Sequence, residues 1–398
     1  MKILITGAKG FLGRNLTETL RALMDGRNRT RPELRIDALY LYDVDSDPGT
    51  LSDWCGDCDF VFHLAGVNRP QNEVEFTTGN VDFTQRLLSL LQEHNNNCPV
   101  MLASSIQAAG EGRFKNSVYG KSKALAEALV FRHAEKTGAK ALVFRLPNLF
   151  GKWSRPDYNS VVATFCYRIA RGLPIEIHDP DVRLSLLYID DLVDTLLDAL
   201  EGRVQRCGCG RNTAQEDDEK YCFAPGAHDV RLGELAELLY GFSVLPQTLT
   251  LPEMENGSLI KKLYATYLSF LPPQQAAYPL QVREDARGSF TELVKTVSCG
   301  QFSVNVSNPG VTKGEHWHHS KWELFIVVSG EALIRQRAIH SEEVFEFRVS
   351  GSEPTAVRML PGYTHSIVNL SDTEKLITLM WANERFDPSR PDTFSEPV

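Results

Sequence analysis

The chain lacks long apolar runs and any excess of positive charge. Of its 398 residues 42% are apolar, yet no stretch of about 18 uninterrupted apolar residues is present to span a bilayer. The 42 basic residues are outnumbered by 51 acidic ones, which gives a formal charge of −9. That balance, without a basic stripe carrying interleaved aromatic residues, disfavours nucleic acid as a partner. We therefore expect a soluble protein that binds neither membrane nor nucleic acid.

A signal peptide and a disulfide framework are also missing. The first residues, Met1 to Gly7, run straight into a strand and a glycine turn and leave no room for a cleavable signal. Eight cysteines are present, and the pairs Cys55–Cys58 and Cys207–Cys209 invite a metal or disulfide interpretation. In a chain of this length that we expect in the cytoplasm, free thiols are the favoured interpretation.

The first part of the chain alternates short apolar strands with amphipathic helices, and no internal repeat interrupts it. This alternation predicts an α/β fold with a parallel, doubly wound sheet of the Rossmann type. A later helix is expected at 190–202, opening on Asp190 and Asp191, which are placed to cap it. Residues 203–221 lack periodicity and suggest an exposed insertion, and the α/β domain is expected to end near residue 245.

The character of the sequence changes after residue 245. Residues 246–280 mix prolines with one helical stretch at 259–270 and are interpreted as a connector. From 281 to 398, short strands rich in Val, Ile, Phe and Thr are separated by Gly, Pro, Ser and Asn, as in an antiparallel barrel. The expected domains are therefore 1–245, 246–280 and 281–398.

A glycine-rich loop lies between the first expected strand and the first expected helix. Glycines there let the backbone approach a pyrophosphate, while the helix N-terminus supplies N–H donors and a partial positive charge. We expect this loop to bind a dinucleotide through Gly7, Lys9, Gly10, Phe11, Leu12 and Gly13.

A Tyr-x-x-x-Lys pair, Tyr119 and Lys123, follows a serine at the end of the preceding strand, with Ser105 best placed. Tyrosine has a pKa of about 10, and a neighbouring ammonium favours its phenolate and brings it toward the working range. Lys123 would do this while binding the nicotinamide ribose. Ser105 would hydrogen-bond the substrate oxygen, and Tyr119 would exchange a proton with it as a hydride moves at the attached carbon.

A metal-ligand pattern occupies the last part of the chain. Two histidines separated by one residue on a strand point to the same face, and a carboxylate and a third histidine can close a pocket around one ion. The expected ligands are His316, His318, Glu323 and His365. With Gly310, Gly330, Gly362 and Asn369, they match the two motifs of a cupin barrel. Three imidazoles and one carboxylate suit Zn, Mn, Fe or Ni, and affinity alone does not select among them. A barrel without its metal, or with a purely structural ion, is the competing interpretation.

Together these features resemble the CapF-type enzymes of capsular polysaccharide and O-antigen synthesis, over nearly the whole chain. The segments that carry the resemblance are HLAGVNRP at 63–70, PNLFGKW at 147–153, NSVVATFCY at 159–167, YATYLSFLP at 264–272 and KGEHWHHSK at 313–321.

The resemblance implies an extended short-chain dehydrogenase/reductase domain fused to a zinc-bearing cupin, generally as a homodimer. It implies that the cupin inverts C3 of a UDP-2-acetamido-2,6-dideoxy-4-ketohexose. The reductase then reduces the C4 ketone with NADPH to UDP-2-acetamido-2,6-dideoxy-L-talose, on the route to UDP-N-acetyl-L-fucosamine. Only while the ketone exists is the adjacent C3 proton acidic.

The resemblance also implies roles for further residues. Leu64, Ala65 and Gly66 would contact the coenzyme, and Asn148 and Asn159 would lie near the nucleotide-sugar, although a turn amide and a helix cap are equally good interpretations of the two asparagines. Candidate proton carriers beside the metal ligands are His319, Lys321 and Tyr363, with no reason in the sequence to choose among them.

Asp43, after the second strand, departs from the pattern of an NADPH enzyme. An aspartate there can hydrogen-bond a ribose 2′-hydroxyl and repel a 2′-phosphate, so NADH stays possible beside the favoured NADPH. Lys9 and Arg14 are the positive charges available nearby.

Two alternatives remain open. The same Ser, Tyr and Lys would serve a UDP-sugar 4-epimerase or a dehydratase, although dehydratases usually need an acidic pair beside the relay and residues 104–107 offer none. The cupin could also be a noncatalytic, sugar-binding or dimerisation module.

Overall fold

The computed structural model describes residues 1–206 and 220–398, which fold into two compact units. The first comprises Met1–Leu239 with Lys262–Leu271, and the second comprises Tyr240–Lys261 with Pro272–Val398. The expected domain limits at 245 and 280 stay predictions. Of the expected insertion, residues 207–219, including Cys207 and Cys209, lie outside the described residues.

The first unit is built on a six-stranded sheet in which every pairing is parallel, in the order β2-β1-β3-β4-β5-β8. Its strands are β1 (Lys2–Thr6), β2 (Ala38–Tyr42), β3 (Phe60–His63), β4 (Val100–Ser105), β5 (Ala141–Leu146) and β8 (Tyr221–Cys222). The chain leaves β1 on one side for β2 and returns on the other for β3. Ligands of such sheets bind at the carboxyl ends of the strands where the order reverses, here β1 and β3.

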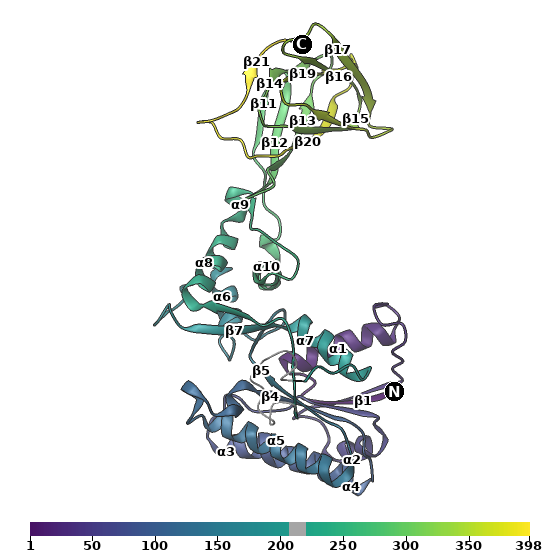
Figure 1. Ribbon diagram of the computed structural model, residues 1–398, viewed down its shortest axis with the longest axis vertical. Helices are drawn as coiled ribbons and strands as arrows, with labels where there is room; N and C mark the ends of the chain where they lie inside the picture. Colours follow the sequence, from purple (N-terminus) through teal and green to yellow (C-terminus); the bar gives the residue numbers. More distant parts are fainter. Residues whose placement is uncertain (207–219) are drawn as a thin grey trace. The chain divides into compact units, whose positions relative to one another are not determined.

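Helices cover both faces of this sheet (Figure 1). Because successive side chains of a strand point to opposite faces, Ile3 and Ile5 pack with α1 and α7, whereas Leu4 packs with α2, α4 and α5. The helices of this unit are α1 (Phe11–Met24), α2 (Pro48–Asp57), α3 (Val74–Phe76), α4 (Phe83–Glu93), α5 (Val118–Thr137), α6 (Val161–Ile169), α7 (Ile189–Leu200), and most of α8 (Leu232–Ser243) and α10 (Leu259–Ser269), with short turns η1 (Thr77–Asp82), η2 (Ile106–Ala109) and η3 (Gly112–Phe114). The predicted doubly wound sheet is confirmed.

A second, three-stranded sheet in this unit contains β6 (Asn148–Phe150), β7 (Arg183–Tyr188) and β9 (His228–Arg231). Helix α7 follows β7 directly, and its N-cap is Tyr188. The expected capping by Asp190 and Asp191 is wrong: both lie inside the first turn, where their charge interacts favourably with the helix dipole.

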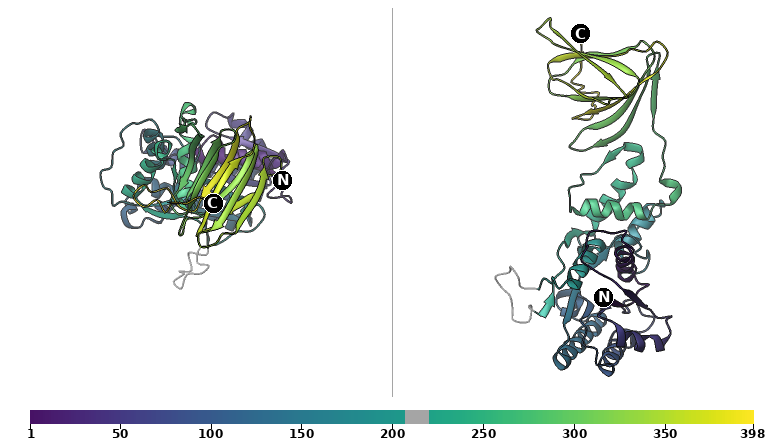
Figure 2. Two further views of the ribbon diagram at one scale, coloured as in Figure 1. Left: turned by 90° about the horizontal axis from the view of Figure 1, so that it is seen from above. Right: turned by 90° about the vertical axis from the view of Figure 1, so that its right-hand side faces the viewer.

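The second unit is an all-β barrel, whose wrapped strands are visible in the right-hand view of Figure 2. One sheet has the order β10-β12-β13-β20-β15-β18, with β11 paired to β12, and the other has the order β17-β16-β19-β14-β21. The strands are β10 (Thr250–Leu251), β11 (Val282–Asp285), β12 (Gly288–Thr296), β13 (Gln301–Ser307), β14 (Thr312–Trp317), β15 (Glu323–Ser329), β16 (Glu331–Ala338), β17 (Val344–Ser350), β18 (Ala356–Met359), β19 (Tyr363–Asn369), β20 (Leu376–Ala382) and β21 (Phe394–Ser395), with helical turns α9 (Leu245–Thr248) and η5 (Pro273–Gln275).

The barrel core forms where the two sheets face each other. Phe325 and Val327 from β15, Ile334 from β16 and Ile367 from β19 belong to one buried cluster. Apart from the β10–β12 contact the pairings are antiparallel, so the predicted C-terminal barrel is confirmed. Within the described parts of both units, no helix combines the length and the apolar character needed to cross a membrane.

Candidate active site and metal centre

The glycine loop lies at the carboxyl end of β1, against the loop that follows β3. Gly7 has φ +72°, and a Cβ atom on it would lie 2.7 Å from the backbone nitrogen of Ala65, while a Cβ on Gly13 would lie 2.1 Å from the carbonyl oxygen of Gly7. Only glycine fits either position. The two loops expected to contact a coenzyme, 7–13 and 64–66, are therefore adjacent in the structure.

The start of α1 fits an anionic ligand. Its N-cap is Gly10, and no side chain from the described residues caps its first turn, so the N–H groups of that turn stay available to a phosphate. Lys9 and Gly10 are exposed and Phe11 is partly buried. The side chain of Leu12 points into the core, so only its backbone can face the ligand.

Asp43 follows β2 and holds the glycine loop from the side. Its carboxylate accepts hydrogen bonds from the backbone N–H of Lys9 at 2.7 Å and of Val44 at 2.8 Å. The Lys9 ammonium, in turn, forms an exposed ion pair with Asp45 at 2.5 Å. The positive charge expected from Lys9 is thus partly neutralised, which weakens its attraction for a coenzyme 2′-phosphate.

Ser105, Tyr119 and Lys123 come together at the carboxyl end of β4. Ser105 is the last residue of β4, and its hydroxyl lies near enough to the Tyr119 phenol to lower the pKa of that group. Tyr119 and Lys123 lie one turn apart on α5, whose N-terminus is capped by Ser117 accepting from the N–H of Gly120. The neighbouring Ser104 instead donates to Glu127. This difference explains why Ser105, and not Ser104, is the serine available to the relay.

The charges in this relay differ from the sequence-based expectation. Burial raises the pKa of Tyr119, and the nearby Ser105 hydroxyl offsets this only in part. Burial lowers the pKa of Lys123 to about 8, while Glu127 acts in the opposite direction. The expected lowering of the Tyr119 pKa is therefore wrong for this arrangement, because burial disfavours the phenolate more than Ser105 favours it. The Lys123 ammonium lies toward Gly66, 3.3 Å from a Cβ built there.

Sequence reasoning missed two buried polar residues that support this site. Asn80, in the π-helical turn η1, bonds both the N–H and the carbonyl of Val67 at 2.8 and 3.0 Å, and its amide donates to Ser122 at 2.9 Å. His63 lies between the hydroxyls of Thr6 and Thr84 at 2.7 and 2.8 Å. Burial first, and Lys123 second, lower the pKa of His63 to about 3, so it is neutral.

The two asparagines assigned to the nucleotide-sugar are both exposed. Asn148 begins β6 and donates to the carbonyl of Ser185 at 3.2 Å. Asn159 precedes α6, but the cap of that helix is the side chain of Ser160, so the helix-cap interpretation of Asn159 is wrong. A role of either residue in substrate binding stays a prediction.

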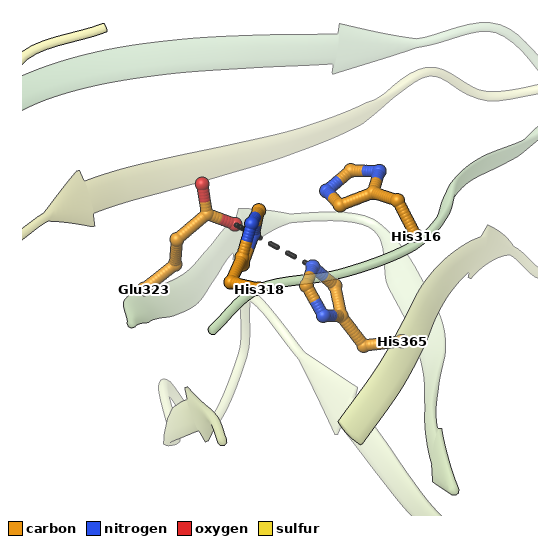
Figure 3. Close-up of side chains that lie close together, drawn as sticks. All are labelled: His316, His318, Glu323 and His365. Atoms are coloured by element: carbon orange, nitrogen blue, oxygen red, sulfur yellow. Dashed lines mark ion pairs between the residues drawn. The ribbon is translucent and has the colours of Figure 1, made fainter. Parts of the chain in front are cut away.

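In the second unit, His316, His318, Glu323 and His365 converge on one point inside the barrel (Figure 3). His316 on β14 is the cross-strand partner of His365 on β19, and Glu323 opens β15. One ligand atom from each of the four residues lies within 4.8 Å of the others. Four residues that span 50 positions of sequence are therefore gathered as an ion would require.

The unpartnered ligand atoms and the protonation of these side chains are compatible with a bound cation. The Nε2 atoms of His318 and His365 lie 3.7 and 3.5 Å from Oε2 of Glu323, too far for hydrogen bonds, and all three atoms are buried without a partner. Burial lowers the pKa of His316 to about 4. Burial opposes ionisation of Glu323, but His318 and His365 outweigh it and hold the pKa of the carboxyl well below its usual range. Neutral imidazoles and an ionised carboxylate are the forms that bind a metal.

The three candidate proton carriers occupy different environments. Tyr363 is two residues from His365 on β19, so both side chains point to the same face of the sheet. His319 is exposed, and its ring forms a T-shaped contact with the Trp317 ring. Lys321 is buried, and its ammonium donates to the hydroxyl of Thr393 at 3.0 Å.

Comparison with known proteins covers both units. Residues 3–206 match the model of the NAD dependent epimerase/dehydratase family, and residues 283–394 match the polysaccharide biosynthesis C-terminal domain. A protein of Pseudomonas aeruginosa, UDP-2-acetamido-2,6-beta-L-arabino-hexul-4-ose reductase, is 39% identical over 395 residues, which are 99% of this chain and 98% of the relative.

Solved structures agree with this. The capsular polysaccharide assembling protein CapF from Staphylococcus aureus superposes with a TM-score of 0.85 at 42% identity, covering 100% of both chains. A UDP-glucuronic acid 4-epimerase from Bacillus cereus, solved with NAD, covers 68% of this chain and 98% of its own at a TM-score of 0.51 and 21% identity, which shows the fold alone. Membership of an NAD-dependent family supports a nicotinamide coenzyme at the glycine loop. The chain belongs to the CapF-type family, in which an epimerase/dehydratase domain is joined to a polysaccharide biosynthesis C-terminal domain.

Proposed function

We propose that the chain is a bifunctional UDP-sugar enzyme. Its first unit would reduce the C4 ketone of a UDP-2-acetamido-2,6-dideoxy-4-ketohexose, and its cupin would first invert C3, so that the product is UDP-2-acetamido-2,6-dideoxy-L-talose. The observation that carries the proposal is the grouping of Ser105, Tyr119 and buried Lys123 at the carboxyl end of the sheet, with the Lys123 ammonium beside Gly66 of an expected coenzyme loop. The full-length similarity to a 4-keto-sugar nucleotide reductase supports the substrate class.

The first site is organised for reduction. A bound nicotinamide coenzyme supplies the hydride. The Ser105 hydroxyl holds the ketone oxygen, and Tyr119 donates a proton to that oxygen. Because burial raises the pKa of Tyr119, the phenol carries its proton near neutral pH, which is the form that a reduction needs. Lys123 binds the coenzyme ribose and returns a proton to the phenolate.

The coenzyme is proposed as NADPH, with NADH as the alternative. The Asp43 carboxylate already accepts hydrogen bonds from two backbone N–H groups, which partly offset its negative charge and so weaken its repulsion of a 2′-phosphate. Lys9 is paired with Asp45, which leaves the exposed Arg14 as a further cation for a 2′-phosphate. Comparing kcat/KM for the two coenzymes on one 4-keto substrate decides between them.

The second site is proposed to hold Zn²⁺ through His316, His318, Glu323 and His365. A bound zinc would stabilise negative charge that develops on the sugar oxygen when the C3 proton leaves. Of the three candidate carriers, we propose Tyr363 as the group that moves this proton, because it shares the face of β19 with His365. His319 is exposed and its ring lies in a T-shaped contact with Trp317, and the ammonium of Lys321 donates a hydrogen bond to Thr393. The homodimer and the cytoplasmic location implied by the family stay predictions.

Incubation of the protein with the 4-keto sugar nucleotide in deuterated water, without any coenzyme, tests the division of labour. Deuterium at C3 supports a catalytic cupin, and NMR of the sugar measures it. No deuterium at C3, in a protein that reduces the same substrate once NADPH or NADH is added, would leave a reductase with a noncatalytic barrel.

A further inference from the structure

The C-terminal segment of the second unit crosses the loop that carries the proposed metal ligands. Its short strand β21 pairs with β14, with Ser395 opposite His316 and Phe394 opposite Trp317. The Phe394 ring stacks on the Trp317 ring at 4.8 Å. Residues 391–398, here called the tail, thus lie along the same strand that supplies His316.

Asp392 makes the most direct contact between the tail and a ligand. Its backbone carbonyl lies 2.6 Å from Nδ1 of His318, a side chain that is only 1% exposed. A carbonyl oxygen can only accept, so Nδ1 carries the proton of this imidazole. The lone pair is then on Nε2, the atom that lies 3.7 Å from Glu323. The contact therefore selects the tautomer that can bind an ion through Nε2.

The Asp392 side chain holds the rest of the loop. One carboxylate oxygen accepts the N–H of His319 at 2.9 Å, and the other accepts the N–H groups of Ser320 and Lys321, each at 2.9 Å, and the Ser320 hydroxyl at 3.2 Å. These three residues are most of the connection between His318 and Glu323. A single side chain thus fixes the spacing between two ligands.

The backbone of Asp392 is shaped for this double contact. Its φ is +38°, outside the range that most side chains favour. This turn lets the carbonyl and the carboxylate of one residue face the same loop. Aspartate and asparagine are among the few residues other than glycine that tolerate such a φ.

We propose that Asp392 is a positioning residue of the metal centre, with its carbonyl orienting His318 and its carboxylate setting the loop that leads to Glu323. This inference rests on the proposed metal site. Residues that orient metal-bound histidines typically change metal affinity by about 10-fold to 100-fold when they are replaced.

The test compares Asp392→Gly, Asp392→Asn and wild type as full-length chains stripped of metal. Glycine keeps the positive φ and the carbonyl but removes the carboxylate. Asparagine keeps one acceptor oxygen, so this variant still gives a result when the glycine variant fails to fold. Asp387→Ala is the matched control, because Asp387 also lies near the C-terminus but its carboxylate accepts from the backbone N–H and the hydroxyl of Ser389, within its own turn. Zn²⁺ affinity is measured by competition with a chromophoric chelator, and the visible absorption of the Co²⁺-loaded proteins reports the ligand geometry.

We expect Zn²⁺ binding about 10-fold to 100-fold weaker in Asp392→Gly, a smaller loss in Asp392→Asn, an altered Co²⁺ spectrum in both, and wild-type behaviour in Asp387→Ala. A merely structural role would lower the melting temperature of the metal-free protein without changing the Co²⁺ spectrum. Unchanged affinity and spectrum in folded variants, beside tight binding in wild type, would overturn the positioning role alone. Absence of stoichiometric Zn²⁺ binding in wild type would overturn the metal centre and the positioning role together.

Discussion

Replacement of Lys123 by methionine should stabilise the protein while it abolishes reduction. Lys123 is 5% exposed, and burial lowers its pKa from 10.5 to about 8. A shift of about 2.5 units corresponds to ~3 kcal/mol of unfavourable free energy for keeping this ammonium in the folded protein at neutral pH. Methionine has a similar unbranched shape and no charge. Glu127 is not orphaned, because Arg145, Ser104 and Tyr221 still bond its carboxylate.

We therefore expect Lys123→Met to raise the free energy of unfolding of the first unit by about 1–3 kcal/mol at pH 7. The sign of the pH dependence follows from the lowered pKa. Wild type carries the full penalty below pH about 8, where the folded protein holds the charge, and loses it as the pH rises toward 10.5. The advantage of the variant should accordingly shrink over this interval. Reductase activity should fall at least about 100-fold, because the variant lacks the Lys123 ammonium that supplies a proton to Tyr119.

Urea denaturation, with hydrogen exchange on peptides from β4 and β5 as the readout, measures the free energy of unfolding of the first unit separately from that of the second. The matched control is Lys121→Met on the same helix, because Lys121 is exposed and its removal should change stability by no more than about 0.5 kcal/mol. A Lys123→Met protein that is less stable than wild type at pH 7, with a difference that does not respond to pH, would refute the reasoning from burial.

Three further predictions test the two sites separately. Tyr119→Phe should lower reduction about 100-fold or more but leave deuterium exchange at C3, and loss of both activities in a folded protein would contradict two independent sites. His316→Ala combined with His365→Ala should release bound zinc, measured by metal analysis, and remove C3 exchange; exchange at the wild-type rate would exclude the ion from the chemistry. Asp45→Asn should raise the ratio of kcat/KM for NADPH over NADH by no more than about fivefold, because it frees the Lys9 ammonium from an exposed and therefore weak ion pair. An unchanged ratio would exclude Lys9 from recognition of the 2′-phosphate.

The predictable parts of the fold are those that depend on the spacing of residues close together in the sequence. The side chains of β1 alternate between two helical layers, with Ile3 and Ile5 on one side and Leu4 on the other, so the doubly wound sheet follows from periodicity. The metal ligands were predictable for the same reason. His316, His318 and Glu323 lie within eight positions, from the end of β14 to the start of β15, and His365 is carried by a second recognisable motif.

The parts that were not predictable depend on partners far away in sequence or on the direction of a side chain. Asp392 is 74 residues from His318, and no local pattern links them. Asn80, in the π-helical turn η1, bonds the backbone of Val67, 13 positions earlier in the chain. The pKa of Tyr119 was predicted in the wrong direction because the Tyr-x-x-x-Lys spacing shows a neighbouring lysine but not how deeply the phenol is buried, and burial raises this pKa.

Under the proposed function, the two sites also differ in which of them decides the product. Loss and return of the C3 proton is reversible as long as the C4 ketone is present, so the cupin by itself can only equilibrate the two C3 isomers. Reduction at Tyr119 removes the ketone and with it the acidity of C3, which makes the isomer that the reductase accepts the one that accumulates. A Tyr119→Phe protein should therefore leave a mixture of C3 isomers that both carry deuterium, whereas wild type with coenzyme should yield a single reduced isomer.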